Sequence, residues 1–322
     1  MNNYTIITAN RASSLLYSFL TSGDNRPYLI PANVCPVIPM TFRLANINFS
    51  FADIDGGSLC IDKQSCYEFV KKHNGYAGIV YVRTYGSLVN EESFFGDLKE
   101  EFPNSVIIDD RCLCLPSFEI DDTVADLVLY STGYAKQVDL GGGGFCFVRN
   151  NRFTLDNKLL FVEDNLNERC RALFEKGEVV KAEEHIYWLK VAPLSESDIN
   201  YREQVINKIN DRERHRASIN EIYKTMLPKD IQLADNFLNW RFNIRVEHKL
   251  QERIIDSLFK NGLFASCHYK PVNRLFNEDR LKESEQLADT VINLFNDYHY
   301  TEIMAEQTAE LVVKVLIEEN KY

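Results

Sequence analysis

The chain has 322 residues, of which 45% are hydrophobic, and its formal net charge at pH 7 is −11. A chain of this length can bury a large core and divide into two domains. The acidic balance, without a long run of Lys and Arg, argues against a nucleic-acid partner. The longest uncharged stretch, residues 27–42, contains four prolines and is too short to span a membrane.

The start of the chain and its cysteines favour a cytoplasmic protein. Arg11 is the one basic residue before the apolar segment that follows, and no small-residue cleavage site comes after it, so no export signal is predicted. The eight cysteines are sparse and mostly in apolar contexts, which is typical of buried thiols in a reducing compartment. Cys112 and Cys114 form an isolated C-x-C without a second pair at zinc spacing, so no metal site is predicted.

The first predicted element is a helix opened by Thr8–Ser14 and running to about Leu20. Backbone amides at a helix start bind anions readily, and Asn10, Arg11 and two serines add possible donors. The same residues could equally be a simple capping segment.

Short apolar runs then alternate with helix-like segments through the first half of the chain. The helix-like segments include Ser65–Lys72 and Phe94–Glu101. The predicted buried strands are Tyr28–Ile30, Asn46–Phe51, Ile79–Val82, Val106–Ile108, Leu127–Tyr130 and Phe145–Val148. This alternation predicts a largely parallel sheet with helices on both faces.

Two carboxylates, Asp109 and Asp110, end the predicted strand that begins at Val106. Buried carboxylates need a partner, and the carboxyl ends of strands are where open α/β sheets bind ligands. A helix cap or a salt bridge is the alternative reading, and the residues alone do not separate the two aspartates.

Lys136 follows the next strand, five residues after Ser131, and precedes a run of four glycines, Gly141–Gly144. An isolated lysine is usually an exposed surface residue. Here it lies on a loop beyond a strand end, and the glycines allow close approach of the backbone. The glycines do not form a Walker motif, because a strand and not a helix follows them.

The second half of the chain is richer in helix. It begins with a long charged helix over residues 198–226, followed by a strand at Trp240–Val246 and a helix at His248–Asn261. A short strand then leads into Cys267, and Thr301–Glu318 forms the last helix. The pattern predicts a smaller α+β domain, with residues 1–190 as the large domain and 191–322 as the small one.

These segments together resemble the DegT/DnrJ/StrS family of sugar aminotransferases, which are pyridoxal-phosphate enzymes of fold type I. The resemblance runs nearly from end to end. The matching segments are Tyr28–Cys35, Asn46–Asp55, Val82–Gly86, Ile107–Asp110, Ser131–Lys136 with Gly141–Phe145, Ala265–Pro271 and Leu287–Phe295.

The resemblance implies a three-layer αβα large domain, a small C-terminal α+β domain and a site for pyridoxal 5'-phosphate. It implies that Lys136 holds the cofactor as a Schiff base and moves a proton during the reaction. It makes Asp110 the partner of the pyridine nitrogen and Ser131 a phosphate ligand, and it places the helix start at the phosphate: Asn10, Arg11 and Ala12. Cys35 falls where an aromatic residue of the family commonly stacks on the cofactor ring.

The sequence also departs from the family pattern. Almost nothing precedes Thr8, and Asn10-Arg11 replaces the usual Gly-Thr. Leu113 stands where a polar residue is normal, three positions after Asp110. The segment Asn200-Tyr201-Arg202 resembles a family motif, but it lies so far along the chain from the lysine that we interpret it as a chance match.

The resemblance implies an aminotransferase that moves an amino group from a donor such as glutamate to a keto-sugar nucleotide for glycan synthesis, as a homodimer. The candidate cations for a nucleotide diphosphate are Arg11, Arg83, Lys270 and Arg274. One alternative is a pyridoxal-phosphate enzyme with a non-sugar substrate, suggested by the short N-terminus. Another is a relative without turnover, suggested by Cys35 and Leu113, although Lys136 and Asp110 are both retained.

Overall fold

The computed structural model describes residues 4–120, 122–149, 153, 155, 166–181 and 189–319. The strands in these residues are β1 (Tyr4–Ala9), β2 (Tyr28–Pro31), β3 (Phe49–Ala52), β4 (Gly78–Val82), β5 (Val106–Asp110), β6 (Leu127–Ser131), β7 (Gly144–Arg149), β8 (Phe242–Arg245), β9 (Ala265–Ser266) and β10 (Val291–Leu294). The α-helices are α1 (Ala12–Ser22), α2 (Val37–Leu44), α3 (Lys63–Lys72), α4 (Glu92–Glu101), α5 (Leu166–Lys176), α6 (Asp198–Met226), α7 (His248–Lys260), α8 (Lys282–Thr290) and α9 (Glu302–Glu319). Short 3-10 turns include η1 (Thr84–Gly86), η3 (Asp235–Phe237) and η4 (Val272–Phe276).

Seven of the described strands form one large sheet in the order β1-β7-β6-β5-β4-β2-β3. Strands β2 to β6 are parallel to their neighbours, whereas β7 is antiparallel to both β6 and β1. The parallel strands therefore place their carboxyl ends at one edge of the sheet. Ligands of open α/β sheets bind at this edge.

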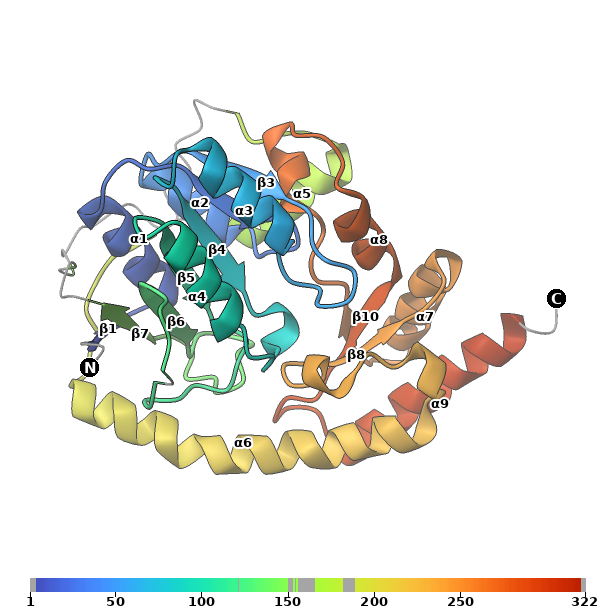
Figure 1. Ribbon diagram of the computed structural model, residues 1–322. Coiled ribbons are helices and arrows are strands. Elements are labelled where there is room, and N and C mark those ends of the chain that lie inside the picture. Colours follow the sequence, from blue (N-terminus) through green and yellow to red (C-terminus); the bar gives the residue numbers. More distant parts are fainter. Residues whose placement is uncertain are drawn as a thin grey trace.

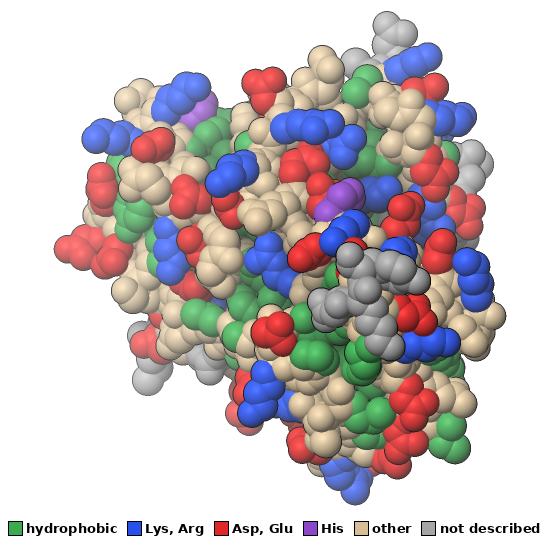
Figure 2. All heavy atoms as spheres, turned by 90° about the vertical axis from the view of Figure 1, so that its right-hand side faces the viewer, with side chains coloured by type: hydrophobic (Ala, Val, Ile, Leu, Met, Phe, Trp, Pro, Cys, Tyr) green, Lys and Arg blue, Asp and Glu red, His purple; other side chains and the backbone are tan. Residues whose placement is uncertain are grey.

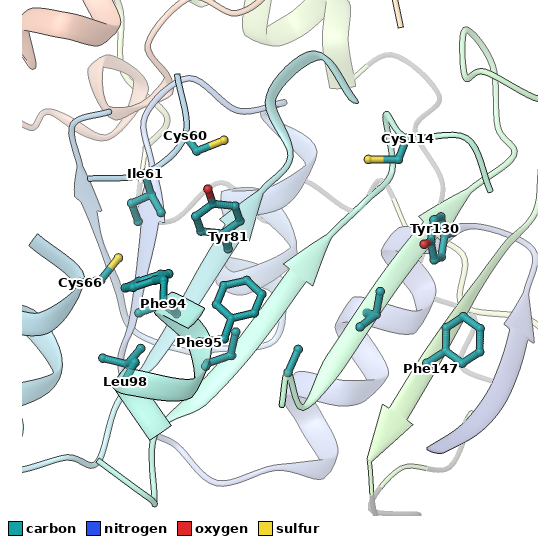
Figure 3. Packing of buried hydrophobic residues seen from close by; sticks show 14 of the residues in the cluster. Cys60, Ile61, Cys66, Tyr81, Phe94, Phe95, Leu98, Cys114, Tyr130 and Phe147 are labelled. Atoms are coloured by element: carbon teal, nitrogen blue, oxygen red, sulfur yellow. The ribbon is translucent and has the colours of Figure 1, made fainter. Parts of the chain in front are cut away.

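Helices cover both faces of the large sheet. On one face, Phe94, Phe95 and Leu98 of α4 pack toward Tyr81 of β4, with α3 beside them (Figure 3). On the other face, α1 and α2 pack against β2, β4, β5 and β6. Because both faces are buried, the central strands need no polar alternation, and β4 is buried at every residue.

A second, three-stranded antiparallel sheet of described residues has the order β8-β10-β9. It packs with α7, α9 and the C-terminal part of α6. The 29 residues of α6 run along the molecule from the region of β1 to α9 (Figure 1). Tyr201 and Val205 near the start of α6 join the core of the large sheet, whereas Ile219 and Tyr223 join that of the small sheet.

Acidic and basic side chains are interspersed on the face that Figure 2 shows. Between α7 and α9, Lys249 and Arg253 both form ion pairs with Glu319. Among the described residues, no helix is both long enough and apolar enough to cross a membrane.

The structure confirms the predicted α/β class, the layers and all six predicted strands of the first half. The predicted division at residue 190 stays a prediction. Two boundaries were wrong. The strand predicted from Asn46 begins only at Phe49, because Asn46 has a left-handed backbone (φ 56°) after the end of α2. The helix predicted to open at Thr8 begins at Ala12, because Thr8 and Ala9 pair with Phe145 and Gly144 in the sheet.

Candidate active site

Three predicted site residues lie at the carboxyl edge of the large sheet. Asp110 is the last residue of β5, and Ser131 is the last residue of β6. These strands are adjacent and parallel, with Asp110 beside Leu129. The loop that follows Ser131 carries Lys136 back toward this edge, and the charge of Lys136 is close enough to act on Asp110.

Asp109 points to the opposite face of β5 from Asp110, as the alternation of a strand requires. It is fully buried and accepts hydrogen bonds from Arg83 at 2.8 and 2.9 Å and from Arg111 at 2.7 Å. Burial alone would raise the pKa of Asp109, but the two guanidinium groups outweigh it and hold this pKa below its usual range. Asp109 therefore has two cationic partners within the chain.

The same network removes one candidate cation. Arg83 was predicted as a possible ligand of a nucleotide diphosphate, but it is 5% exposed. Its guanidinium binds both oxygens of Asp109 and the carbonyl oxygen of Val89. These contacts argue against Arg83 as a ligand of a diphosphate, because its side chain is buried and its charge is already paired with Asp109.

Asp110 has a different environment. It is 5% exposed, and one carboxylate oxygen accepts the backbone N–H of Cys112 at 2.9 Å. Burial raises the pKa of Asp110, although the hydrogen bonds from Cys112 and the charge of Lys136 act in the opposite direction. No ion pair to Asp110 is present among the described residues. This carboxylate is thus buried, and Lys136 is the cation whose charge acts on it.

The loop that carries Lys136 is held by its own backbone and by the small sheet. The N–H of Lys136 donates to the carbonyl oxygen of Gly133 at 3.3 Å, and Ala135 has a left-handed backbone with φ 60°. The N–H of Ala135 donates to Asp139, and its carbonyl oxygen accepts the indole N–H of Trp240 at 2.7 Å. These contacts fix the path of the chain on both sides of Lys136.

Gly143 brings the start of α1 against the end of β6. Its N–H donates to the carbonyl oxygen of Asn10 at 2.6 Å, and its own carbonyl oxygen accepts the N–H of Thr132. Its φ is +89°, and a Cβ here would lie 2.7 Å from the Thr132 hydroxyl and 2.8 Å from the Tyr201 ring. Only glycine fits this position, as the predicted role of the glycine run requires.

The predicted anion-binding residues at the start of α1 divide into two groups. Arg11 is exposed and bridges to Gly143, and the first amides of α1 follow at Ala12. First-turn amides have no acceptor within their own helix. The side chain of Asn10, in contrast, donates to the carbonyl oxygen of Lys190 and accepts from Ser14. This engagement argues against the Asn10 side chain as a phosphate ligand.

Sequence reasoning missed Tyr201. This residue is 1% exposed, and its hydroxyl lies 2.8 Å from that of Thr132, the residue after Ser131. Tyr201 belongs to the Asn200-Tyr201-Arg202 segment, whose distance from the lysine and whose flanking residues favour a chance match to the family motif. Helix α6 nevertheless brings Tyr201 to the end of β6, and the chance match stays a prediction.

Cys35 lies within electrostatic range of both Lys136 and Asp110, although it is partly exposed. Burial raises the pKa of its thiol, so the thiol is neutral. Tyr269 is also close to Cys35 and Asp110, both of which raise its pKa together with burial. Cys35 thus stands beside the predicted site but offers no ring, while Tyr269 offers one nearby.

An aromatic wall formed by Tyr85, Trp240 and Tyr269 stands beside the lysine loop. The rings of Tyr85 and Trp240 stack at 6.3 Å, and those of Trp240 and Tyr269 at 6.5 Å. His268 packs edge-on against Trp240. Burial, Arg241 and Lys136 lower the pKa of His268 to about 4, so this imidazole is neutral at pH 7.

The structure also shows the surroundings of Leu113 and of two further candidate cations, Lys270 and Arg274. Leu113 is buried in the apolar cluster around Tyr85, and its carbonyl oxygen accepts from Gln137. Lys270 is exposed, whereas Arg274 forms an ion pair with Glu285 at 3.5 Å.

Comparison with known proteins gives a likeness in structure and none in sequence. No protein-family model and no curated protein matches the chain. A putative sugar aminotransferase from Streptococcus pneumoniae, solved in its PMP form, has a TM-score of 0.71 and 14% identity, covering 96% of this chain and 87% of that one. Helicobacter pylori PseC, an aminotransferase involved in the biosynthesis of pseudoaminic acid, has a TM-score of 0.69 and 17% identity, covering 96% and 86%.

A third similar structure is that of GDP-4-keto-6-deoxymannose-3-dehydratase (ColD), a mutant form with bound GDP-perosamine. It has a TM-score of 0.69 and 14% identity, covering 95% of this chain and 88% of that one. These matches confirm the predicted fold, which is the α/β fold of pyridoxal-phosphate enzymes of fold type I. At such low identity the likeness extends to the fold alone.

Proposed function

We propose that this chain is a pyridoxal-phosphate-dependent aminotransferase that carries its cofactor on Lys136. The observation that carries the proposal is the pair of Asp110 and Lys136 at the carboxyl ends of adjacent strands. Within the described part of the chain, Asp110 is buried without a guanidinium partner, whereas its neighbour Asp109 has two. Such a carboxylate suits a ligand that brings its own positive charge.

The described residues fit the cofactor at three points. Asp110 offers a buried carboxylate to a protonated ring nitrogen. Ser131 accepts the N–H of Gly133 at 3.3 Å, and its own proton is available to an anion. The first amides of α1, at Ala12, provide the positive end of a helix for a phosphate group, and Gly143 holds that helix start against the end of β6.

When bound, pyridoxal phosphate supplies an electron sink for a proton that leaves the substrate carbon. The amine of Lys136 would hold the cofactor and would serve as the base for that proton. The buried carboxylate of Asp110 would favour a protonated ring nitrogen.

We further propose that the amino acceptor is a keto-sugar nucleotide and that the donor is an amino acid such as glutamate. Two of the similar structures support this substrate class, because one enzyme takes part in pseudoaminic acid biosynthesis and the other holds GDP-perosamine. With Arg83 buried, Arg11, Lys270 and Arg274 are the candidate cations for the diphosphate. A homodimer in the cytoplasm is part of the same proposal.

The second candidate is a transaminase with a keto substrate that is not a sugar. It is favoured because Arg83 is buried and Arg274 is paired with Glu285, so that fewer cations are available to bind a diphosphate.

A substrate panel separates the two candidates. The purified protein with pyridoxal phosphate is given L-glutamate and either keto-sugar nucleotides or simple keto acids, and formation of the amino product is measured. The main proposal expects turnover with a keto-sugar nucleotide. Turnover with keto acids alone would favour the second candidate, and no change in cofactor absorbance with any amino donor would contradict both.

A further inference from the structure

Two successive carbonyl groups in the lysine loop are held from outside the large sheet. The carbonyl oxygen of Ala135 accepts the indole N–H of Trp240 at 2.7 Å, and that of Lys136 accepts a terminal N–H of Arg216 at 3.4 Å. Trp240 precedes β8, and Arg216 lies on α6. The backbone position of Lys136 therefore depends on groups that belong to the part of the chain around the small sheet.

Arg216 also holds Trp240 in place. Its other terminal nitrogen donates to the carbonyl oxygen of Trp240 at 2.6 Å and to the side chain of Asn296. Asn296, which is fully buried, donates in turn to Asn220 at 2.9 Å. Arg216 thus acts on the lysine loop directly through one carbonyl group and indirectly through the indole of Trp240.

The charge of Arg216 is not balanced in the usual way. The side chain is 5% exposed, and no carboxylate forms an ion pair with it among the described residues. Asp297, whose negative charge acts on Arg216, is bound by Arg241 at 2.7 Å. Burial and the charges of Arg241 and Arg212 lower the pKa of Arg216 to about 9.

An unbalanced buried cation is unfavourable for folding. Buried charges without a balancing partner are expected mainly at functional sites. The three acceptors that Arg216 binds are all neutral, and two of them belong to the lysine loop or to the tryptophan that anchors it. This placement links the unfavourable charge to the position of Lys136.

We propose that Arg216 is a positioning residue for Lys136, which it holds at the carboxyl edge of the large sheet by fixing Trp240 and the Lys136 carbonyl group. The inference rests on the proposed function, since it assigns to Lys136 a task that requires a fixed position. It adds to that function a residue that is 80 positions from Lys136 in the sequence and lies on helix α6.

The test compares Arg216→Met with Arg214→Met in the cofactor-free full chain. Arg214 is the matched control, because it lies on the same helix with a side chain that is 79% exposed. Hydrogen exchange is followed in the peptide that covers residues 133–140, together with exchange in β8 and β10. The rate at which added pyridoxal phosphate becomes attached to Lys136 is measured by its absorbance.

In Arg216→Met we expect exchange in residues 133–140 to be about tenfold faster, the effect of losing one hydrogen bond from a charged donor. Attachment of the cofactor should slow by about the same factor, since the lysine is less often in place. Arg216→Lys, which keeps the charge and a single donor nitrogen, should recover part of both effects. Arg214→Met should match the wild type.

Unchanged exchange in residues 133–140 in a folded Arg216→Met protein would overturn the proposal. An equal increase in β8, β10 and the loop would also overturn it, because that pattern describes general loss of stability. If Arg216→Met does not fold, Trp240→Phe decides the matter. This variant keeps the stacked ring but loses the N–H, and unchanged loop exchange in it contradicts the proposal.

The exchange measurement needs no cofactor. If the wild type takes up no pyridoxal phosphate, the proposed function fails, while the loop measurement still decides whether Arg216 holds the chain at Lys136.

Discussion

Strand β5 ends in two aspartates whose side chains point to opposite faces of the sheet, and the surroundings of the two carboxylates differ. On the face of α3 and α4, Asp109 is enclosed by Arg83 and Arg111, which donate three hydrogen bonds to it. On the face of α1 and α2, Asp110 accepts a backbone N–H from Cys112 and pairs with no guanidinium group of the described residues. We refer to these as the Asp109 network and the Asp110 site.

The difference separates a structural role from a functional one. In a buried ion network, the opposite charges pair with one another and link neighbouring elements. Such a network has no unpaired charge with which to bind a ligand. A buried carboxylate that lacks such a partner is tolerated where a ligand or a nearby lysine supplies the charge. The Asp110 site is of the second kind, and each prediction below tests the contrast between the two faces.

The largest effect is expected from Asp109→Asn, which leaves the buried guanidinium of Arg83 without its carboxylate and weakens the pairing of Arg111, which keeps Glu92 at 3.8 Å. We expect the variant to lose about 3–5 kcal/mol of its free energy of unfolding, as measured by urea denaturation. Asp211→Asn is the control, because the pair of Asp211 and Arg214 is largely exposed. That control should change stability by less than about 0.5 kcal/mol. An equally small loss of stability in Asp109→Asn would contradict the proposed difference between the Asp109 network and the Asp110 site.

Asp110→Asn should reduce the activity of the protein without lowering its stability. The substitution removes a buried negative charge without stranding a guanidinium, so the cofactor-free protein should stay folded. Transamination should fall by about 10²–10³-fold, because the ring nitrogen loses the group that stabilises its charge. Initial rates with saturating donor and acceptor measure this loss. Near-normal rates in Asp110→Asn would refute the assignment.

The two aspartates should also differ in the pH dependence of stability. The pKa of Asp109 is lowered in the folded protein, so its stabilising effect is present above the ordinary carboxyl range, about pH 4, and is lost as the pH falls through the lowered value. The pKa of Asp110 is raised, so its contribution is greatest below that range and is lost as the pH rises through the raised value.

Urea denaturation of the cofactor-free variants between acidic and neutral pH measures both effects. The loss of stability in Asp109→Asn should shrink as the pH falls. Asp110→Asn should gain stability relative to the wild type as the pH rises toward neutral. Parallel curves for the two variants would contradict the directions given for their pKa values.

The smallest effect is expected from Tyr201→Phe at the edge of the Asp110 site. The variant keeps the ring that packs over Gly143 and loses only the hydrogen bond to Thr132. We expect a loss of about 1 kcal/mol in the free energy of unfolding. Cofactor attachment should change little, since Thr132 also donates to the carbonyl oxygen of Gly142. A large fall in cofactor attachment would mean that Tyr201 has a more direct role.

Much of the fold could be predicted because the central strands are buried on both faces. Continuous apolar runs such as Ile79–Val82 are distinctive in a sequence, and β4 is buried throughout. Strand β1 could not be recognised in this way. It is an edge strand with exposed residues such as Ile6, and its extended shape depends on pairing with β7, about 140 positions away.

The candidate site could be predicted only in part. Lys136, Ser131 and the glycine run are neighbours in the sequence, so their association was visible there. The choice between Asp109 and Asp110 depends on which face Arg83 and Arg111 occupy, and this is a property of the folded sheet. Trp240 and Arg216 reach the lysine loop from distant elements, and no local pattern marks them. Tyr201 lay in a recognisable segment, but only the fold shows that it reaches Thr132.

The central claim is that Lys136 carries pyridoxal phosphate, and chemical trapping tests it most directly. The protein is incubated with pyridoxal phosphate, reduced with borohydride and digested, and the labelled peptide is sequenced. We predict a single label on Lys136, at about one per chain, and its loss in Lys136→Ala. A label on any other lysine, or no label on a folded wild-type protein, would contradict the account.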